Sequence, residues 1–458
     1  MVEVMGNTFD DDDFFADLQH DLDAKADVLE AKKAVKPITG NTPEEQPVKR
    51  TLFLGDPWED KLVVDPKGWA IANHANLSHT IRCHGEWTEA LAYNSFTGRK
   101  ILLKPIPGTP VERSFKPREI EDRDILSATS WFNRNLFPRA AKNQVADAID
   151  DVVFDAIINP VKHFLEDCEA AWDSEPRLAK WLTMYAGVEI EDPAHAQYVE
   201  EVGIKWCVSA VARVMEPGCK ADGVLILEGS QGAGKSTAAK VLAGTEFFGD
   251  SLPPMHSKEA SGYVRGRWII ELAELANVSK AEVEVVKAFI SRSEERFRPP
   301  YGRNEVTFPR QCVFIGSTNR TDYLRDDTGN RRFWPVKVGK IDTEGLQRDR
   351  VQLWGEAVHR YRKGEKWWLT RAAETIAAAE TKARLIDDPW TSEVLSKVMG
   401  KSETCVSAIL SDMLIEVGRR DRLMSNRVVS ILLQNGWARD GQFTAQPHKG
   451  QAKFVKKG

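Results

Sequence analysis

The sequence contains no long hydrophobic run, so a membrane-spanning protein is not expected. None of its 458 residues lies in an apolar stretch near the roughly 18 residues that a bilayer span requires. The segment from Met1 to Asp13 also lacks the basic region and apolar core of a secretory signal. We therefore expect a cytoplasmic protein with no membrane partner.

Cysteine is scarce, and the cysteines present are widely scattered. The chain has six of them, and no two stand at C-x-x-C spacing. This pattern argues against a zinc site and against a disulfide framework, so we expect reduced thiols. The six residues are Cys83, Cys168, Cys207, Cys219, Cys312 and Cys405.

Acidic and basic residues nearly balance over the whole chain, but they are unevenly distributed. The formal net charge is −5, yet the first 30 residues hold ten acidic groups and a single lysine. Such a composition cannot support a hydrophobic core, so residues 1–50 are predicted to be an acidic disordered tail and linker. Phe14, Phe15, Leu18 and Leu22 stand at helical spacing, which leaves open that this segment docks a basic partner such as a replication protein.

Residues 51–205 comprise two segments that differ in the pattern of their apolar residues. Residues 51–121 hold short apolar runs broken by glycine, proline and asparagine, which predicts a small β-containing module with a hairpin of residues 90–93 and 100–103. Residues 122–205 are predicted to be helical because apolar residues recur at a period of 3.6. One such stripe comprises Val145, Ile149, Val152, Val153, Ala156 and Ile157.

The stretch from Gly229 to Ser236 reads Gly-Ser-Gln-Gly-Ala-Gly-Lys-Ser, which fits G-x-x-x-x-G-K-[ST]. Before it, residues 224–227 form an apolar run typical of a buried parallel strand. After it, residues 236–243 are predicted to form a helix that stops at Gly244. This strand, loop and helix context is what a phosphate-binding loop requires, whereas a chance glycine-rich turn does not need it.

In a loop of this kind the glycines let backbone N–H groups and the helix N-terminus face the phosphates. Lys235 is expected to reach the β and γ phosphates of ATP, and the Ser236 hydroxyl to ligate Mg²⁺. The predicted nucleotide-binding residues are Gly229, Ser230, Gln231, Gly232, Ala233, Gly234, Lys235, Ser236 and Thr237.

Two further apolar strands carry polar residues that suit nucleotide hydrolysis. Residues 268–274 deliver Glu271 and Glu274, and a P-loop ATPase needs one carboxylate for Mg²⁺ and one to orient the attacking water. Residues 312–316 lead to Asn319, which is placed to touch the γ-phosphate or its water. An ordinary turn residue is the alternative for Asn319, and a surface strand is the alternative for residues 268–274.

Two cationic segments are predicted to contact a neighbouring subunit and nucleic acid. Arg331 and Arg332 precede an apolar strand, where one of them can serve as an arginine finger offered to a neighbouring subunit. Residues 296–303 are both cationic and aromatic, as expected of a loop that contacts nucleic acid, although a plain basic loop remains open. The predicted nucleic-acid-binding residues are Arg296, Arg298, Tyr301 and Arg303.

The C-terminal part, residues 386–458, is predicted to be a separate winged-helix-like domain. Apolar stripes at residues 406–417 and 426–434 predict two helices, and residues 437–455 predict a hairpin. From residue 401 onward there are ten lysines or arginines against five acidic residues. This balance suits phosphate contact, and a protein-interaction role stays open beside it.

Residues 90–369 together resemble the virulence-associated protein E family of phage and prophage proteins, which are similar to superfamily 3 helicases. The resemblance rests on the loop Gly229–Ser236 and on several segments around it. These segments are Trp172-Asp173 with Arg177-Leu178 and Trp181, Val211–Val214 with Pro217–Lys220, Trp268–Leu275, Lys287–Ile290, Arg298–Arg303, Ser317–Asn319, Gly329–Val336 and Leu353–Ala357.

The resemblance implies an α/β fold whose residues 206–385 form a P-loop AAA+-type ATPase domain. It also implies a ring, expected to be a hexamer, that moves on single-stranded or forked DNA. Lys235 and Ser236 would then bind nucleotide and Mg²⁺, Glu271 and Glu274 form the acidic strand, Asn319 sense the γ-phosphate, and Arg331 or Arg332 act as finger. Ala273 departs from the expected Asp-Glu pair, which leaves the division of labour between the two glutamates open.

We therefore expect an ATP-dependent DNA helicase or translocase of a phage or mobile element that acts in DNA replication. The main alternative is an ATP-switched DNA-binding initiator or loader that does not unwind processively. A small-molecule P-loop kinase is a third class, but Asn319 and the arginine pair favour a ring ATPase, since a finger in trans requires a neighbour. Primase activity is not expected, because no carboxylate cluster at metal-ligand spacing precedes residue 200 outside the acidic tail.

Overall fold

The computed structural model describes residues 57–109, 115–273, 280–298, 304–324, 330–385 and 388–457. By its contacts the chain divides into two units. One runs to residue 321 and continues over residues 326–383, and the other comprises residues 322–325 and 384–458. Among the described residues, no helix combines the length and apolar character needed to cross a membrane.

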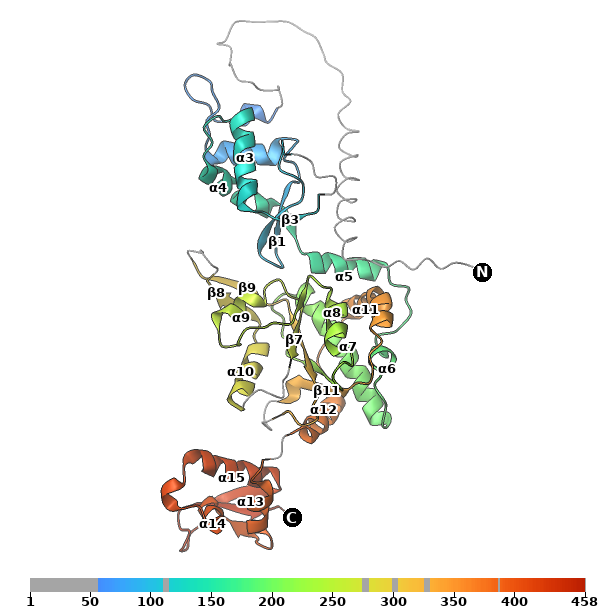
Figure 1. Cartoon of the computed structure of the whole chain (residues 1–458), viewed down its shortest axis with the longest axis vertical. Coiled ribbons are helices and arrows are strands. Elements are labelled where there is room, and N and C mark those ends of the chain that lie inside the picture. Colours follow the sequence, from blue (N-terminus) through green and yellow to red (C-terminus); the bar gives the residue numbers. More distant parts are fainter. Residues whose placement is uncertain are drawn as a thin grey trace, which may run out of the picture. The chain divides into compact units, whose positions relative to one another are not determined.

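The first unit begins with a mixed module built on a four-stranded sheet (Figure 1). Its strands are β1 (Leu91–Asn94), β2 (Arg99–Leu102), β3 (Arg118–Glu119) and β4 (Ile157–Ile158), in the order β3-β2-β1-β4. The predicted hairpin is confirmed, because β1 and β2 pair antiparallel from Leu91–Leu102 to Asn94–Arg99.

Helices from both sides of residue 121 pack on one core in this module. They are the 3₁₀ turn η1 (Glu59–Lys61), α2 (His74–Cys83), α3 (Asp122–Asn135), α4 (Lys142–Val152) and the 3₁₀ turn η2 (Val153–Asp155). The shared core runs from Leu62 to Val153 and includes Trp87, Trp131 and Phe132. The segments on either side of residue 121 therefore form one packed module.

One helical stripe predicted here is partly wrong. Helix α4 ends at Val152, and Ile157–Ile158 forms β4, which pairs parallel with Tyr93 and Asn94 of β1. Two consecutive isoleucines are β-branched and favour a strand, and Asn159 then caps the next helix, α5 (Pro160–Ala170). The long-range partner in β1 therefore overrides the local helical period.

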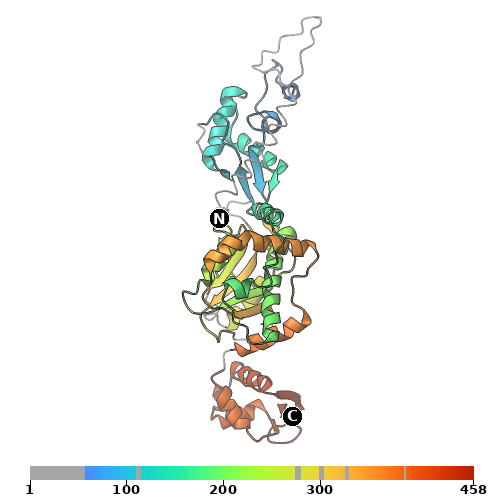
Figure 2. The ribbon, with the colours of Figure 1, turned by 90° about the vertical axis from the view of Figure 1, so that its right-hand side faces the viewer.

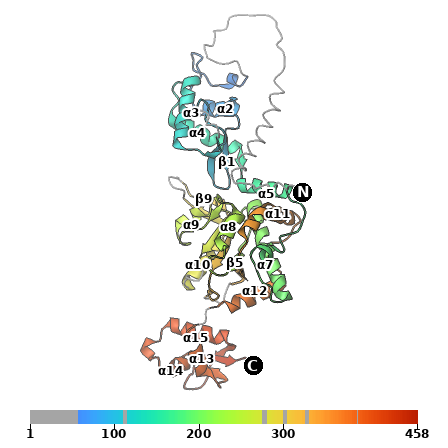
Figure 3. The same ribbon diagram turned by 45° about the vertical axis from the view of Figure 1, so that its right-hand side comes forward.

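A five-stranded parallel sheet forms the centre of the first unit (Figures 1 and 3). Its order is β11-β5-β10-β7-β6, and all four neighbouring pairs are parallel. Four of its strands, β5, β7, β10 and β11, confirm predicted apolar runs, which are typical of strands covered on both faces, whereas β6 was not predicted. The strands are β5 (Val224–Glu228), β6 (Phe248–Gly249), β7 (Ile269–Ala273), β10 (Val313–Thr318) and β11 (Phe333–Lys337).

Helices cover both faces of this sheet (Figure 2). Val313 and Ile315 of β10 belong to a core shared with α5, α7, α8 and α11. Phe314 points to the other face, where its ring lies 6.0 Å from that of Phe289 in α10. The helices are α6 (Trp181–Tyr185), α7 (Pro193–Met215), α8 (Lys235–Ala243), α9 (Lys258–Tyr263), α10 (Lys280–Ile290), α11 (Thr343–Arg362) and α12 (Arg371–Ala383).

A two-stranded hairpin, β8 (Glu294–Phe297) with β9 (Val306–Pro309), stands between α10 and β10 in the chain. Its base is fixed by a buried ion pair between Glu295 and Arg310. Ser261 of α9 also donates a hydrogen bond to Glu295 over 2.6 Å. Two buried charges are stable only when paired in this way, so the pair holds the hairpin at a defined place on the core.

The described part of the second unit contains three elements that the sequence did not predict, namely a short helix, a short strand and a 3₁₀ turn. They are α13 (Thr391–Val398), β12 (Glu403–Thr404) and η5 (Val417–Arg419), beside the predicted helices α14 (Val406–Asp412) and α15 (Arg422–Gln434). Strands β13 (Trp437–Gln442) and β14 (Ala452–Lys456) complete a sheet of order β12-β14-β13. The predicted helix at 406–417 is shorter than expected, because Leu414 adopts a left-handed φ of 59°.

Candidate functional site

The loop from Gly229 to Gly234 joins β5 to α8, as the motif predicts. Gly232 and Gly234 have φ values of 80° and 94°, which only glycine adopts without strain. A Cβ on Gly229 would lie 2.9 Å from the carbonyl oxygen of Val338, so this glycine allows close approach of the segment after β11. The loop is thereby curled toward the carboxyl edge of the sheet.

Neighbouring backbone fixes the curled loop in place. The Gly229 N–H donates to the Thr318 carbonyl oxygen over 3.1 Å at the end of β10. The Ile341 N–H donates to the Ala233 carbonyl oxygen over 2.9 Å. The loop is therefore held by β10 on one side and by the segment after β11 on the other, which keeps its remaining N–H groups in one arrangement.

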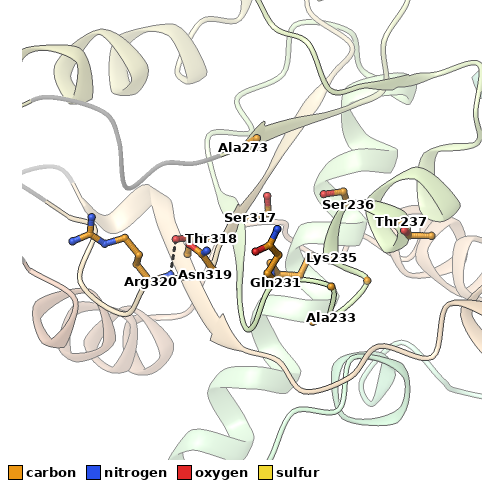
Figure 4. Close-up of a pocket in the computed structure, with 12 residues that line it drawn as sticks. Gln231, Ala233, Lys235, Ser236, Thr237, Ala273, Ser317, Thr318, Asn319 and Arg320 are labelled. Atoms are coloured by element: carbon orange, nitrogen blue, oxygen red, sulfur yellow. Dashed lines mark hydrogen bonds between the residues drawn. The ribbon is translucent and has the colours of Figure 1, made fainter.

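A hollow of about 680 Å³ opens beside this loop, at the carboxyl ends of β5, β7 and β10 (Figure 4). That volume lies within the usual range for small-molecule sites. Ligands of open α/β sheets bind at this edge of the sheet. The lining residues are Gln231, Gly232, Ala233, Gly234, Lys235, Ser236, Thr237, Ala273, Ser317, Thr318, Asn319 and Arg320.

A buried carboxylate lies under the first turn of α8. Glu271 of β7 is only 5% exposed, and its Oε1 accepts hydrogen bonds from Ser236 Oγ at 2.7 Å and from Ser317 Oγ at 2.5 Å. Burial of a carboxylate is costly without such partners. Glu271 thus joins three elements at one point, namely α8, β7 and β10.

Lys235 lies at the entrance of the hollow with its ammonium group turned onto the loop. Its Nζ donates to the carbonyl oxygens of Gly229 at 2.9 Å and Ser230 at 2.8 Å. Burial lowers the pKa of Lys235, and the Glu271 carboxylate opposes that shift. The ammonium group is therefore held by two uncharged carbonyl acceptors, which negatively charged phosphate oxygens can replace.

The carboxyl end of β10 brings two more side chains to the hollow, Asn319 and Arg320. Asn319 is one of the predicted site residues, and it lines the hollow as an exposed side chain (Figure 4). Arg320 was not predicted, although its place directly after Asn319 at a strand end was a usable signal. A permanent positive charge at this position suits an anionic ligand.

Two oxygen ligands that lie close together, the Ser236 hydroxyl and the Glu271 carboxylate, fit a magnesium ion. Mg²⁺ is usually held by one or two protein oxygens, with waters and substrate phosphates completing its shell, and Ser236 with Glu271 supplies that set. Among the residues that the structure describes, no group of three His, Cys, Asp or Glu side chains is placed to hold a metal by itself. Glu274, the second predicted carboxylate, lies outside the described residues.

Residues 165–386 match the virulence-associated protein E-like domain. The chain carries a virulence-associated protein E-like domain. The family resemblance inferred from the sequence is therefore confirmed. This domain begins within α5, ends after α12 and contains the whole central sheet with the hollow.

Solved structures similar to the chain include two of the NrS-1 C-terminal region in its apo state. The first, an A form, is 10% identical with a TM-score of 0.41 and covers 84% of this chain and all of the other. The second is 12% identical with a TM-score of 0.41 and covers 80% of this chain and 96% of the other. No curated protein matches the sequence.

Within the virulence-associated protein E-like domain, Arg331 and Arg332 lie at the amino-terminal ends of the parallel strands, whereas the hollow lies at their carboxyl ends. Phe333 of β11 pairs with Val224 of β5, so Arg331 and Arg332 lie level with the start of β5, whereas the loop follows its end. Five residues of extended strand span roughly 16 Å. Neither arginine therefore lies next to the loop of its own chain.

The two arginines differ in their surroundings. Arg332 Nε donates to Ser291 Oγ over 2.7 Å and pairs with Asp222 at 3.3 Å. Arg331 is exposed, and among the described residues its guanidinium has no ion-pair or hydrogen-bond partner. Arg332 is thus bound into its own domain, and Arg331 is available to a ligand or a neighbouring molecule.

Of the four predicted nucleic-acid-binding residues, the structure describes Arg296 and Arg298, at the β8 side of the β8–β9 hairpin. Arg296 is exposed and pairs with Glu305 across the hairpin at 2.9 Å. Arg298 is exposed at the end of β8. Tyr301 and Arg303 lie outside the described residues.

Proposed function

We propose that this protein is an ATP hydrolase that acts on DNA during replication of a phage or other mobile element. The observation that carries this proposal is the contact of Ser236 and Ser317 with buried Glu271, directly beside the glycine loop. The order β11-β5-β10-β7-β6 supports it, since one strand separates the loop strand from the acidic strand, as in AAA+-type ATPases.

In the proposed site the triphosphate of ATP lies along the loop, and Lys235 exchanges its two carbonyl acceptors for phosphate oxygens. Ser236 and Glu271 would hold Mg²⁺, and the ion would supply positive charge next to the phosphates. Because Glu271 already contacts Ser236, we assign it to the metal. Glu274 is then left to orient the attacking water, and Asn319 and Arg320 contact the γ-phosphate from β10.

We infer that the finger is Arg331 and that it acts across a subunit boundary. Its distance from the loop of its own chain excludes action in cis, and it is exposed without a partner in the described part of the chain. A finger in trans requires a head-to-tail assembly, and such an assembly forms a ring when the rotation between neighbours closes. A hexamer is the size that the family resemblance implies.

DNA contact is assigned to two basic places within this proposal. One is the β8–β9 hairpin with Arg296 and Arg298, whose base is fixed by the Glu295–Arg310 pair, and the proposal adds Tyr301 and Arg303 from the sequence alone. The other is the second unit, which we propose to be a winged helix on the grounds of its helix and strand order and its basic residues. Both contacts are expected to weaken with salt.

An ATP-switched initiator or loader is the second candidate. It requires the same ATP site and the same DNA contacts but no repeated movement along the strand. The basic second unit favours this candidate if it holds the protein at one place on the DNA. Strand displacement distinguishes the two, because only a translocase separates a duplex many times the length of its footprint.

The test is strand displacement on a forked duplex, with and without ATP and Mg²⁺. The wild-type protein is expected to release the labelled strand only when both are present. Lys235→Ala is expected to bind the fork and release nothing. ATP turnover by the wild type without strand release supports the loader, and undiminished turnover by Lys235→Ala contradicts the assignment of the site.

A further inference from the structure

A second hollow of about 580 Å³ lies in the N-terminal module, outside the virulence-associated protein E-like domain. It is formed by the segment before α2 and by the segment that follows α3. Its lining residues are Asp65, Lys67, Trp69, Ala70, Ile71, Ala72, Arg134, Asn135, Leu136, Phe137, Pro138, Arg139 and Gln144. The hollow is large enough for about one nucleotide.

Trp69 is presented to this hollow on a rigid turn. Asp65 accepts hydrogen bonds from the N–H groups of Lys67 and Trp69, both at 2.9 Å, and Gly68 has a φ of 81°. Val64 and Ala70 form an antiparallel bridge across the turn. The indole is nevertheless 50% exposed, so a large aromatic face is held open at little further entropic cost.

One buried residue ties this turn to the core of the module. Asn76 of α2 is 1% exposed, accepts from the Val63 N–H at 2.8 Å, and donates to the carbonyl oxygens of Val63 and Ile71 at 2.8 Å. Gln144 of α4 also donates to the Ala72 carbonyl oxygen at 3.3 Å. Two helices thus fix the position of Trp69.

Three cationic side chains line the same hollow as the exposed indole. Lys67 comes from the turn, Arg134 from the last turn of α3, and Arg139 from the segment before α4. All three are exposed, and none forms an ion pair within the described ranges. The carboxylate of Asp65 is the one acidic group lining the hollow, and it already accepts two backbone N–H groups.

We propose that this hollow binds single-stranded nucleic acid, with an unpaired base stacked on Trp69 and the flanking phosphates on Lys67, Arg134 and Arg139. An aromatic face inside a cationic rim is how proteins hold single strands without reading sequence. An acidic peptide needs in addition a broad apolar groove for its anchors. Here Phe137 is buried and Leu136 half-buried, so the exposed apolar lining besides the indole is limited to Ile71 and Pro138.

This site goes beyond the proposed ATPase, because it uses no residue of the nucleotide hollow and requires no ATP. Its binding is therefore measured without nucleotide. It also adds a binding site for single-stranded nucleic acid in a module separate from the β8–β9 hairpin. If the ATPase proposal fails, this site is unaffected, and the reverse holds as well.

The first measurement is binding of a fluorescent 12-mer of deoxythymidine to the full-length protein, followed by anisotropy. Trp69→Ala is expected to weaken binding by about 5- to 100-fold, the range for loss of one stacked base, and Trp69→Phe to retain most of it. Arg134→Ala with Arg139→Ala is expected to weaken binding and flatten its salt dependence. Phe154→Ala and Arg123→Ala, which change an exposed aromatic and an exposed arginine of the same module away from the hollow, are the matched controls.

The second measurement locates the strand directly. A 12-mer containing 4-thiothymidine is crosslinked to the full-length protein by light, and the modified peptide is identified by mass spectrometry. Crosslinks at Trp69 or within residues 134–139 support the proposal, and an oligouridine probe shows whether RNA is held equally. Crosslinks confined to other regions, with Trp69→Ala binding like Phe154→Ala, overturn it.

The acidic segment of residues 1–30 is the competing occupant, and the same protein reports on it. If that segment fills the hollow, a synthetic peptide of residues 1–30 binds a chain lacking residues 1–50, and Trp69→Ala removes this binding. Occupation by the peptide without any crosslink from the oligonucleotide overturns the nucleic-acid proposal. Oligonucleotide crosslinks that the peptide does not displace support it.

Discussion

At the scale of single residues, Glu271 explains more of the candidate site than any other side chain. It is buried, and its two hydroxyl partners come from the helix after the loop and from β10. No packing role requires a carboxylate at this position, since an apolar residue would be cheaper to bury. The energetic cost of burying Glu271 is explained if its carboxylate binds a Mg²⁺ ion that also contacts a phosphate.

The first prediction concerns the division of labour between the two glutamates. Glu271→Gln is expected to lower ATP turnover by about 10²-fold or more and to remove the dependence of nucleotide affinity on Mg²⁺. Glu274→Gln is expected to lose turnover but keep Mg²⁺-dependent binding of a fluorescent ATP analogue. The opposite pattern in steady-state turnover and binding would exchange the two roles.

The second prediction separates Arg331 from Arg332. Arg331→Ala and Arg331→Lys are both expected to reduce turnover by about 10³- to 10⁵-fold while leaving the melting temperature unchanged, because a lysine lacks the forked donors. Arg332→Ala removes contacts to Asp222 and Ser291, so it is expected to lower stability by about 1 kcal/mol. Equal turnover for Arg331→Ala and wild type would refute the finger assignment.

At the scale of elements, α3 shows how a charged group sets the start of a helix. Asp124 accepts two hydrogen bonds from Arg118, both at 2.7 Å, and one from the Glu121 N–H at 2.7 Å. Burial acts to raise the pKa of Asp124, but these donors outweigh it and hold the pKa below its usual range. The carboxylate therefore stabilises the module only while it is ionised.

The third prediction follows from that pKa. Since the folded pKa lies below the unfolded value of about 3.9, the stabilisation is present above that pH and is lost as pH falls through the folded pKa. Asp124→Asn is expected to cost about 2 kcal/mol at neutral pH and less at about pH 3, where the unfolded carboxyl is already mostly protonated, measured by chemical denaturation with tryptophan fluorescence.

Asp122→Asn in the same helical turn is the control for this measurement. Its side chain is 96% exposed, so the change is expected to stay within about 0.5 kcal/mol at both pH values. A pH-independent cost for Asp124→Asn would mean that packing, and not ionisation, accounts for its role.

The sequence predicted those elements whose signals are local. The loop at 229–236 was predictable because its glycines and its flanking strand and helix are read within about 20 residues. Strand β4 was missed because its partner β1 lies more than 60 residues earlier, and two isoleucines alone also fit a helical stripe. The position of Arg331 relative to the loop likewise required the register of β11 on β5.

At the scale of the whole molecule, the proposed ATP site needs residues from more than one chain. In each chain the phosphate-binding loop follows the carboxyl end of β5, and the exposed Arg331 precedes the amino-terminal end of β11. A single chain therefore cannot place Arg331 at its own ATP site. Repeating a head-to-tail contact generates a ring when the rotation closes. Hydrolysis is therefore expected to rise with protein concentration as interfaces form.

The most direct measurement is ATP turnover by a mixture of Lys235→Ala and Arg331→Ala proteins. Each variant alone is expected to be inactive, since one lacks the loop lysine and the other lacks the finger. In an equimolar mixture, roughly a quarter of interfaces join an intact loop to an intact finger, so activity is expected to return and to rise with concentration. Mixtures no more active than their parts, together with wild-type turnover that is unchanged on dilution, would contradict the account.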